Sequence, residues 1–481
     1  MPDLPHSTAT PSAAGPGGSA RKGLRQNCLS FWEVVAQSVA NIAPVATPAL
    51  IIPLVYTSSL AGTWLAYLLA TVAMLLVTYH INQFARRSSS PGALYTYVSQ
   101  GLGPTWGVIS GWSLVIAYLA TGAAVLAGAA NYVVVLAHLA LPARFDFAVA
   151  LAGMLICAAS AWYVAYRDIK LSTRAMLIAE FTSVGLIMIL AIWFLMKTNR
   201  WIDPMQFRLH GVSAGGVRLG LVLAIFSFVG FESATALGDE AKDPLRSIPR
   251  SVLFSVLAVG AFFVFMSYVL ALAEGPALSG NNEPLSMLAN LAGIPGFGIA
   301  IAAGAALSQF ACGLASINAA SRVIFTMGRH GLLHSSIGDA HEVHSTPHIA
   351  VGISSILAAI VPLALLCRGV APLVIFGYLG SVATFGFLFA YILIAVAAPV
   401  YLRHRGEKST LSWIVSLCAL ILLFLPLVGS VYPVPPPPGN YLPYVFVALL
   451  ALGTARFVYL RVSRPELIRE MERRLEEGED T

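Results

Sequence analysis

Two acidic residues, Glu180 and Glu232, lie within stretches of the chain that are otherwise strongly apolar. Glu232 belongs to FSFVGFESATALGDEAKDPLRSIPRS, which begins at Phe226, contains Gly230 and ends in a charged run. An ionised carboxylate is costly in an apolar environment, so acids in such places usually face a cavity or a partner and often titrate with function. Glu232 has three alternative roles. It binds and releases a proton during function, or its hydrogen bonds hold the broken helix in shape, or it lies at the surface without a specific role.

Helix-breaking residues accompany this acid and recur in an earlier apolar stretch. SVANIAPVATPALIIP places Pro44 and Pro48 one turn apart. Proline removes an amide donor and clashes with the preceding turn, so the pair predicts an unwound segment between about Ala43 and Thr47. Gly230 predicts a second break in the later stretch. The alternative for each is an ordinary kink, since proline and glycine are common in membrane helices.

The elements that position these residues are predicted to be membrane-spanning helices. The 481 residues are 58% hydrophobic and 10% charged, against roughly 25% charged residues in an average soluble domain. A helix needs about twenty apolar residues to cross a hydrocarbon core of roughly 30 Å, and such runs recur along the chain. The fold class is therefore all-α, because barrel strands would alternate polar and apolar residues. The twelve predicted spans lie near residues 31–56, 62–84, 105–137, 147–166, 175–196, 217–238, 251–273, 297–321, 349–367, 371–400, 411–431 and 441–462.

Lysine and arginine are distributed unequally over the loops between these spans. With the N-terminus in the cytosol, most of them fall on the cytosolic side, among them Arg86, Lys170 and Arg250. Cytoplasmic loops keep the positive charge, so we expect a multi-pass protein of the cell membrane with both termini in the cytosol and the spans in the lipid bilayer. The same rule accounts for the formal net charge of +6, which gives no support for a nucleic-acid partner.

The two spans that carry breaks are the first and the sixth. They are five helices apart and cross in opposite directions, as an inverted five-helix repeat requires, and broken helices in matching positions of two halves indicate a transporter's central site. In four segments the chain resembles the amino acid, polyamine and organocation (APC) superfamily of secondary transporters. These segments are SSSPGALYTYVSQGLGPTWGVISGW (88–112), RDIKLSTR (167–174), the segment around Glu232, and ASINAASRVIFTMGRHGLLHSSIGDAHEVHSTPHIA (315–350).

The resemblance covers about residues 29–462 and implies a five-plus-five inverted repeat, the LeuT fold, with two further helices. Residues 1–27 are rich in Ser, Pro, Gly and Ala, and we expect them to form a disordered cytosolic tail. The expected boundaries of the remaining parts are 28–200 for the first repeat, 201–404 for the inverted repeat, 405–462 for helices 11 and 12, and 463–481 for a charged cytosolic tail.

The breaks are the predicted substrate site. An amino acid zwitterion needs free amides for its carboxylate and free carbonyls for its ammonium group, and a broken helix offers both. Members of the superfamily commonly carry Gly-Ser-Gly in the first break, whereas this chain has prolines and no glycine there. The candidate substrate-binding residues are Ala43, Val45, Ala46, Thr47, Phe226, Ser227, Phe228, Gly230 and Tyr118. The resemblance implies that Phe226 covers the substrate as a gate; packing between helices is the alternative for the three aromatic residues.

Four residues are candidates for ion coupling: Glu232, Glu180, Ser316 and Asn318. Some members of the superfamily carry a lysine about three residues after the position of Glu180, and its amine is thought to replace a sodium ion. Ser183 stands there in this chain, so the acid almost one turn away becomes the candidate, with a structural pairing as the alternative. Ser316 and Asn318 could contribute oxygen ligands, so a sodium site remains an alternative. Such residues also join membrane helices to each other. A proton is the expected coupling ion rather than sodium.

The sequence contains no nucleotide-binding, nucleophile-elbow or zinc-protease motif in a plausible setting, so we predict no enzyme, cofactor or metal. The leading hypothesis is a secondary active permease that moves an amino acid or a related small molecule by alternating access, through proton coupling or exchange. Two alternatives remain: the same fold with a polyamine, another organic cation or an inorganic ion as cargo, and a non-transporting sensor on this fold. A homodimer is left open as an assembly.

Overall fold

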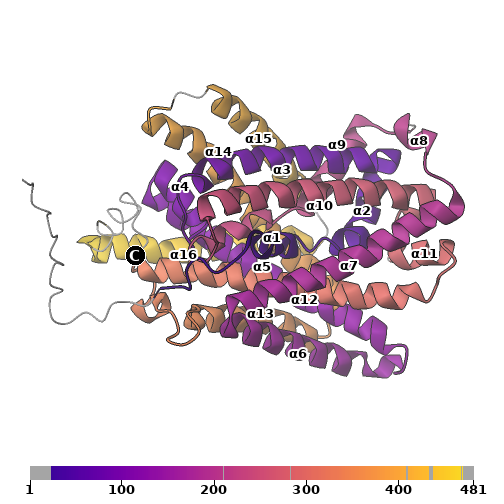
Figure 1. Cartoon of the computed structure of the whole chain (residues 1–481), viewed down its shortest axis with the longest axis horizontal. Helices are drawn as coiled ribbons and strands as arrows, with labels where there is room; N and C mark the ends of the chain where they lie inside the picture. The colour runs from indigo at the N-terminus through magenta and orange to yellow at the C-terminus, as the bar shows by residue number, and fades with distance from the viewer. Residues whose placement is uncertain are drawn as a thin grey trace, which may run out of the picture.

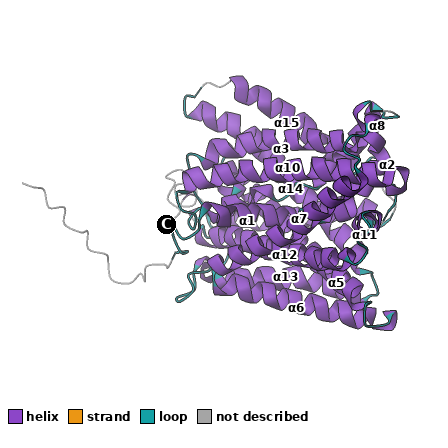
Figure 2. Ribbon diagram, turned by 45° about the vertical axis from the view of Figure 1, so that its right-hand side comes forward, coloured by secondary structure: helices purple, strands orange, loops and turns teal. Residues whose placement is uncertain are grey.

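The structure is a computed structural model that describes residues 23–209, 211–281, 283–407, 410–432, 437–466 and 469. Within these ranges the chain forms helices joined by loops and turns (Figure 2). The β-structure of the described residues is limited to an isolated bridge between Leu29 and Ala241. The prediction of an all-α fold is therefore confirmed, whereas most of the two predicted tails, 1–22 and 470–481, lies outside the described residues.

The helices match the predicted spans closely. Eleven stretches of the described residues are long and apolar enough to cross a membrane, and the first of them, Phe31–Ala85, has 55 residues. At about 1.5 Å per residue it is long enough for two crossings of a core of roughly 30 Å, so twelve crossings result. The principal helices are α1 (Phe31–Ile42), α2 (Ile52–Ser59), α3 (Thr63–Ala85), α5 (Pro104–Ala137), α6 (Asp146–Arg167), α7 (Ile169–Thr198), α9 (Ala214–Phe226), α10 (Pro244–Glu274), α12 (Phe297–Arg329), α13 (His348–Cys367), α14 (Pro372–His404), α15 (Thr410–Gly429) and α16 (Leu442–Ser463).

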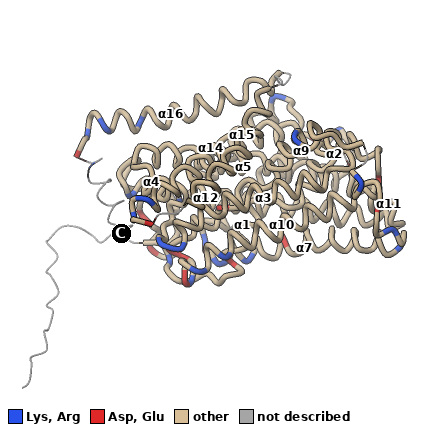
Figure 3. The backbone as a smooth tube through the Cα atoms, turned by 90° about the horizontal axis from the view of Figure 1, so that it is seen from above, with Lys and Arg blue, Asp and Glu red and all other residues tan. Residues whose placement is uncertain are grey.

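These helices run side by side along the long axis of the molecule (Figure 1). Three short helices, α4 (Leu94–Leu102), α8 (Pro204–Phe207) and α11 (Pro284–Leu291), lie near the ends of the bundle (Figure 1). Charged residues gather at its two ends and leave the middle almost uncharged (Figure 3). This distribution suits a bundle whose middle lies in hydrocarbon.

The core is built around α5. It packs against α12 and α14, and 83% of the apolar window of α5 is buried, compared with 22% for α6 and for α16. Glycine, alanine and serine recur along α5, and small side chains allow membrane helices to approach closely. The centre of the bundle is therefore tightly packed, and α6 and α16 lie at its periphery.

Both predicted helix breaks are present. The first helix ends at Ile42, Ala43 adopts a left-handed conformation with φ 52°, and the chain resumes as a π-helix, η1, at Thr47–Ile51. The second break follows α9: Gly230 has φ 91°, and the chain continues as a 3₁₀ helix, η4, at Phe231–Leu237. The first break coincides with the segment around Pro44 that the proline pair predicted, and the second with Gly230.

Candidate functional site

The two breaks lie against each other in the middle of the bundle. The side-chain amide of Asn41 donates to the carbonyl of Gly230 at 3.3 Å, and its oxygen Oδ1 accepts from the hydroxyl of Ser316 on α12 at 2.8 Å. A Cβ atom on Gly230 would lie 2.2 Å from Nδ2 of Asn41. Gly230 is therefore required both by its positive φ and by the close approach of the first broken helix.

Glu232 lies directly behind the second break and is completely buried. Its Oε1 accepts a hydrogen bond from the hydroxyl of Tyr118 at 2.8 Å, and its Oε2 accepts one from the hydroxyl of Tyr391. The Tyr391 hydroxyl in turn accepts from the amide of Gly230 at 3.0 Å. A chain of hydrogen bonds thus joins the carboxylate to the unwound backbone. The surface position is excluded by this burial, and both the shape-holding role and the proton-responsive role of Glu232 stay predictions.

A cavity of about 170 Å³ opens beside the breaks. It is similar in size to the roughly 150 Å³ cavity that can take a benzene molecule. Its lining combines both broken helices with α5, α12 and the first part of α14. The lining residues are Asn41, Ile42, Ala43, Ala46, Thr47, Ile51, Thr121, Ala124, Val125, Phe226, Ser227, Val229, Cys312, Phe376, Gly377, Gly380, Ser381, Ala383 and Thr384.

Five of the nine predicted substrate-binding residues line this cavity: Ala43, Ala46, Thr47, Phe226 and Ser227. The other four stand behind it. Val45 is buried in the main apolar core, and Phe228 packs against Phe263 with ring centroids 5.1 Å apart. Gly230 and Tyr118 belong to the hydrogen-bond chain of Glu232. Phe226 is half-buried at the cavity, whereas Phe228 and Tyr118 are fully buried, and the gate role of Phe226 stays a prediction.

Sequence reasoning missed several residues of the site. Asn41 bridges both breaks, and Thr121, Phe376, Ser381 and Thr384 line the cavity. The sequence could have predicted Asn41 as a site residue, because it is a polar residue one turn before the proline pair in an apolar run. It could not have predicted the residues on α5 and α14, because only the packing of distant helices brings them to the breaks.

The candidate coupling residues occupy different places. Ser316 contacts Asn41, whereas Asn318 donates its amide to the hydroxyl of Ser172 on α7 at 2.6 Å. Glu180 accepts from Ser308 on α12 and does not line the central cavity. The structure therefore joins Ser316 to Asn41 at the breaks, whereas the hydrogen bonds of Asn318 and Glu180 go to Ser172 and Ser308.

The electrostatic character of the cavity is simple. No lysine, arginine, histidine, aspartate or glutamate belongs to its lining. Its polar groups are hydroxyls, the Asn41 amide, the Cys312 thiol and the backbone of the two breaks. The Thr47 hydroxyl is buried and has no hydrogen-bond partner, although buried hydroxyls are normally satisfied. The cavity thus offers hydrogen bonds without a net charge, and one donor at its edge is unused.

The end of the bundle that carries the N-terminal segment is closed by a contact that we call the N-terminal seal. The backbone of Cys28 and Leu29 donates to the carbonyl of Glu240, both at 2.8 Å, and Lys242 donates to the carbonyl of Leu29 at 2.9 Å. The side chain of Glu240 accepts two hydrogen bonds from Arg322 on α12, at 2.6 and 2.7 Å. Both partners are almost fully buried.

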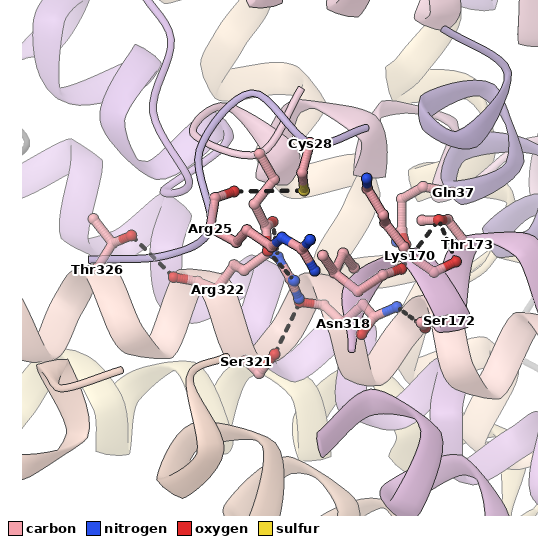
Figure 4. A network of polar contacts seen from close by, with 12 residues as sticks. Arg25, Cys28, Gln37, Lys170, Ser172, Thr173, Asn318, Ser321, Arg322 and Thr326 are labelled. Atoms are coloured by element: carbon pink, nitrogen blue, oxygen red, sulfur yellow. Dashed lines mark hydrogen bonds and ion pairs between the residues drawn. The ribbon is translucent and has the colours of Figure 1, made fainter. Parts of the chain in front are cut away.

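Figure 4 shows the segment with Arg25 and Cys28 lying over the helix that carries Asn318 and Arg322. Arg25 also forms an ion pair with Asp168 at 3.0 Å. Burial raises the pKa of the Cys28 thiol to about 11, and the neighbouring Glu240 acts in the same direction. The segment before α1 is thus fixed by backbone hydrogen bonds to the loop between η4 and α10, and by an ion pair to Asp168 at the start of α7.

Two histidines of the loop between α12 and α13, His341 and His344, lie close to His348, the first residue of α13. The ring centroids of His341 and His344 are 4.8 Å apart, and those of His341 and His348 are 5.2 Å apart. His341 also shares a hydrogen bond with Tyr166. Among the described residues no group of three potential ligands has the spacing of a metal site.

Comparisons with known proteins agree with this architecture. The chain is 26% identical to the branched-chain amino acid permease BcaP of Bacillus subtilis, over 72% of this chain and 75% of that protein. It is 24% identical to the methylthioribose transporter of Bacillus subtilis, over 71% and 74%. It is 24% identical to the low-affinity putrescine importer PlaP of Escherichia coli, over 76% and 78%.

Among solved structures, the crystal structure of MhsT in complex with L-phenylalanine superposes with a TM-score of 0.56 at 15% identity, covering 85% of this chain and 100% of that one. At this identity the likeness shows the fold alone, and it confirms the predicted LeuT fold. The profile of the family described as Amino acid permease matches residues 33–465. The chain therefore belongs to the amino acid permease family and is a multi-pass membrane transporter rather than an enzyme.

Proposed function

We propose that this transporter carries neutral amino acids and that the central cavity between the two breaks is its substrate site. The observation that carries the proposal is the uncharged lining of a small cavity at which two unwound helices meet. Backbone groups at a helix break can serve the carboxylate and ammonium of a zwitterion. A cationic side chain would need a carboxylate that the lining does not provide, because unpaired charges are costly away from water.

The name of one relative supports the same substrate class, since it is described as a branched-chain amino acid permease. Other relatives are described as transporters of methylthioribose and of putrescine. The choice among these classes therefore depends on the cavity. Its apolar side chains, including Ile51, Val125 and Phe376, suit an aliphatic or aromatic substrate side chain.

Thr47 tests this proposal, because its hydroxyl is buried beside the cavity without a partner. Thr47→Val keeps the shape and removes the hydroxyl, whereas Thr47→Ser keeps the hydroxyl. A lost hydrogen bond of roughly 1 kcal/mol should raise KM for leucine uptake by about two- to tenfold in Thr47→Val. Thermal stability should stay unchanged, since the hydroxyl makes no bond within the protein. Equal KM values for both variants and the wild type would place the substrate elsewhere.

The structure supports an outward-facing arrangement for alternating access. The cavity reaches from the breaks to Gly377 and Gly380 in the first turns of α14, at the end of the bundle opposite to the N-terminal seal. Gly377 is exposed, whereas Arg322 and Glu240 of the seal are buried. Transport then requires the seal to open after the substrate is bound.

We place the N-terminal seal on the cytosolic side of the cell membrane, with the two chain ends there. The positive-inside rule supports this assignment, because Arg25, Arg86, Lys170 and Arg322 all lie toward that end. Cys367 ends α13 on the opposite side and is exposed. A membrane-impermeant maleimide should therefore label Cys367 in intact cells; labelling that requires cell lysis would reverse the orientation.

The proposed driving force is a proton gradient or exchange, not sodium. The hydroxyl of Ser316 and the amide of Asn318 already bond to other side chains on different sides of α12, which supports a role in joining helices. Glu232 and Glu180 are the two acids available for a proton. Leucine accumulation in proteoliposomes should follow an inward proton gradient and lose that dependence in Glu232→Gln or Glu180→Gln. Accumulation driven by a sodium gradient alone would contradict this assignment. A homodimer stays a prediction.

A further inference from the structure

Gln309 is a buried amide that forms no hydrogen bond among the residues that the structure describes. It lies on α12, and only 2% of its surface is exposed. Neither its Nε2 nor its Oε1 has a partner. Buried polar atoms are nearly always hydrogen-bonded, because an unsatisfied amide is costly away from water. A methionine of similar length would fill the same space without that cost, so packing alone does not explain this glutamine.

The amide lies next to the wall of the central cavity. A Cβ atom at Gly128 on α5 would lie 2.8 Å from Nε2 of Gln309 and 3.1 Å from Cδ2 of Phe376. The amide and the aromatic ring therefore meet at this glycine. Phe376 is half-buried and lines the cavity, and an aromatic ring is only a weak hydrogen-bond acceptor. A substrate side chain that displaces the ring of Phe376 would reach the free amide.

Gln309 also lies within reach of the first break. Cys312, three residues further along α12, lines the cavity, and its thiol donates to the carbonyl of Asn41 at 3.5 Å. Arg322 of the N-terminal seal lies beyond Cys312 on the same helix, so Gln309 is on the side of the break away from the seal. One turn of helix is about 5.4 Å long. A substrate held by its carboxylate and ammonium at the breaks can span that distance with a side chain of two methylene groups and an amide.

The two free ends of the Gln309 amide define which side chain fits. The nitrogen Nε2 donates and the oxygen Oε1 accepts. An ammonium group offers only donors and a carboxylate only acceptors, so either would leave one end of the amide unpaired. A carboxamide has a donor and an acceptor side by side and can pair with both ends at once. It is also uncharged, as is the lining of the cavity.

We propose that Gln309 is a specificity-determining residue that pairs with a side-chain carboxamide of the substrate, so that glutamine is a preferred cargo. This inference rests on the proposed function, because it keeps the central cavity as the site and neutral amino acids as the class. The ring of Phe376 turns aside to admit the carboxamide, and Gln309 then forms two hydrogen bonds with it.

The test measures how unlabelled glutamine and methionine inhibit the uptake of labelled leucine into proteoliposomes. These two inhibitors are similar in shape, and only glutamine has an amide. In the wild type, glutamine should inhibit at least as strongly as methionine. Gln309→Met should raise the inhibition constant of glutamine at least about tenfold, because two hydrogen bonds are lost, and leave that of methionine within about twofold. Its unfolding temperature should not fall, since the amide has no partner in the described part of the protein.

Gln83→Met is the matched control, because Gln83 lies on α3 outside the cavity lining. Both of its inhibition constants should equal those of the wild type. Phe376→Leu covers the case in which Gln309→Met does not fold. The smaller side chain uncovers the amide, so the inhibition constant of glutamine should fall relative to that of methionine.

The inference is overturned if Gln309→Met changes neither inhibition constant or raises both equally. It is also overturned if Phe376→Leu keeps the wild-type ratio of the two constants. Leucine uptake that glutamine does not inhibit would overturn this inference alone. Absence of leucine uptake by the wild type would overturn the proposed function and this inference with it.

Discussion

Gly230 illustrates how one residue serves two helices. Its φ of 91° is one reason for glycine, and the 2.2 Å that would separate a Cβ atom at this position from Nδ2 of Asn41 is an independent second reason. The backbone strain alone costs roughly 1–3 kcal/mol for a residue with a Cβ atom. The contact between the breaks therefore depends on this glycine.

Gly230→Ala should consequently lower the thermal unfolding temperature and abolish most uptake. Gly185→Ala is the matched control, because Gly185 lies within α7, has no positive φ and would meet nothing within 4 Å. Differential scanning fluorimetry of the purified variants measures the first effect. Equal unfolding temperatures for the two variants would contradict the close approach of Asn41 and Gly230.

The hydrogen bonds of Glu232 make a graded prediction for its two tyrosine partners. Tyr118→Phe removes one bond to the carboxylate, whereas Tyr391→Phe removes a bond to the carboxylate and also leaves the amide of Gly230 without its partner. Each buried group left unsatisfied costs about 1–3 kcal/mol. Tyr391→Phe should therefore destabilise the protein more than Tyr118→Phe. The reverse order in thermal unfolding would show that Tyr391 does not support the break.

At the scale of elements, the sequence predicted what local chemistry determines. The proline pair at Pro44 and Pro48 and the glycine at position 230 predicted both breaks, because these residues act on their own helix. The prediction did not extend to the form of the second half of the sixth span, which is a 3₁₀ helix at Phe231–Leu237. It also missed Asn41 and Tyr391 as partners of Gly230, since these bonds join residues 189 and 161 positions apart.

The N-terminal seal brings together segments far apart in the sequence. The charged segment DEAKDPLRSIPR (239–250) is expected to act as a latch that pairs acid and base, and in the structure the partner of Glu240 is Arg322 on α12, while Ala241 pairs with Leu29 before α1. Nothing in the spacing of these residues indicates a contact between chain segments so far apart. Removing one partner of a buried ion pair is strongly destabilising, by roughly 3–5 kcal/mol, so we expect Glu240→Gln to loosen the seal.

The alkylation rate of the Cys28 thiol can be used to measure whether the N-terminal seal is closed. This thiol has a pKa raised by burial from 9.0 to about 11, and a raised pKa means that the thiol keeps its proton to higher pH. The reactive thiolate is therefore about a hundredfold rarer at neutral pH than at a pKa of 9. Alkylation of Cys28 should be slow at pH 7, rise up to about pH 11, and become faster in Glu240→Gln.

Peptide mass spectrometry after N-ethylmaleimide treatment measures this reaction, with the exposed Cys367 as the internal reference. If the seal opens during transport, saturating substrate should also speed the modification of Cys28. Modification of Cys28 as fast as that of Cys367 at pH 7, in the absence of substrate, would show that the seal is open in solution.

At the scale of the whole molecule, one cavity and one seal define the state of the transporter. The central cavity reaches toward the start of α14, whereas Glu240 and Arg322 close the other end. The two broken helices contribute to both features, since η4 leads to Glu240 and α1 follows the segment that pairs with it. A movement of these helices against α5 and α12 would open the seal and close the cavity together, which is the geometry that alternating access requires.

The measurement that tests the central claim most directly is uptake of labelled leucine, lysine and putrescine into proteoliposomes, by the wild type and by Ala46→Phe. Ala46 lines the central cavity, and Ala148→Phe, at an exposed position of α6, is the control for added bulk. The account predicts that the wild type and Ala148→Phe take up leucine in preference to lysine and putrescine, and that Ala46→Phe does not. Preference for lysine or putrescine, or full leucine uptake by a folded Ala46→Phe, would contradict it.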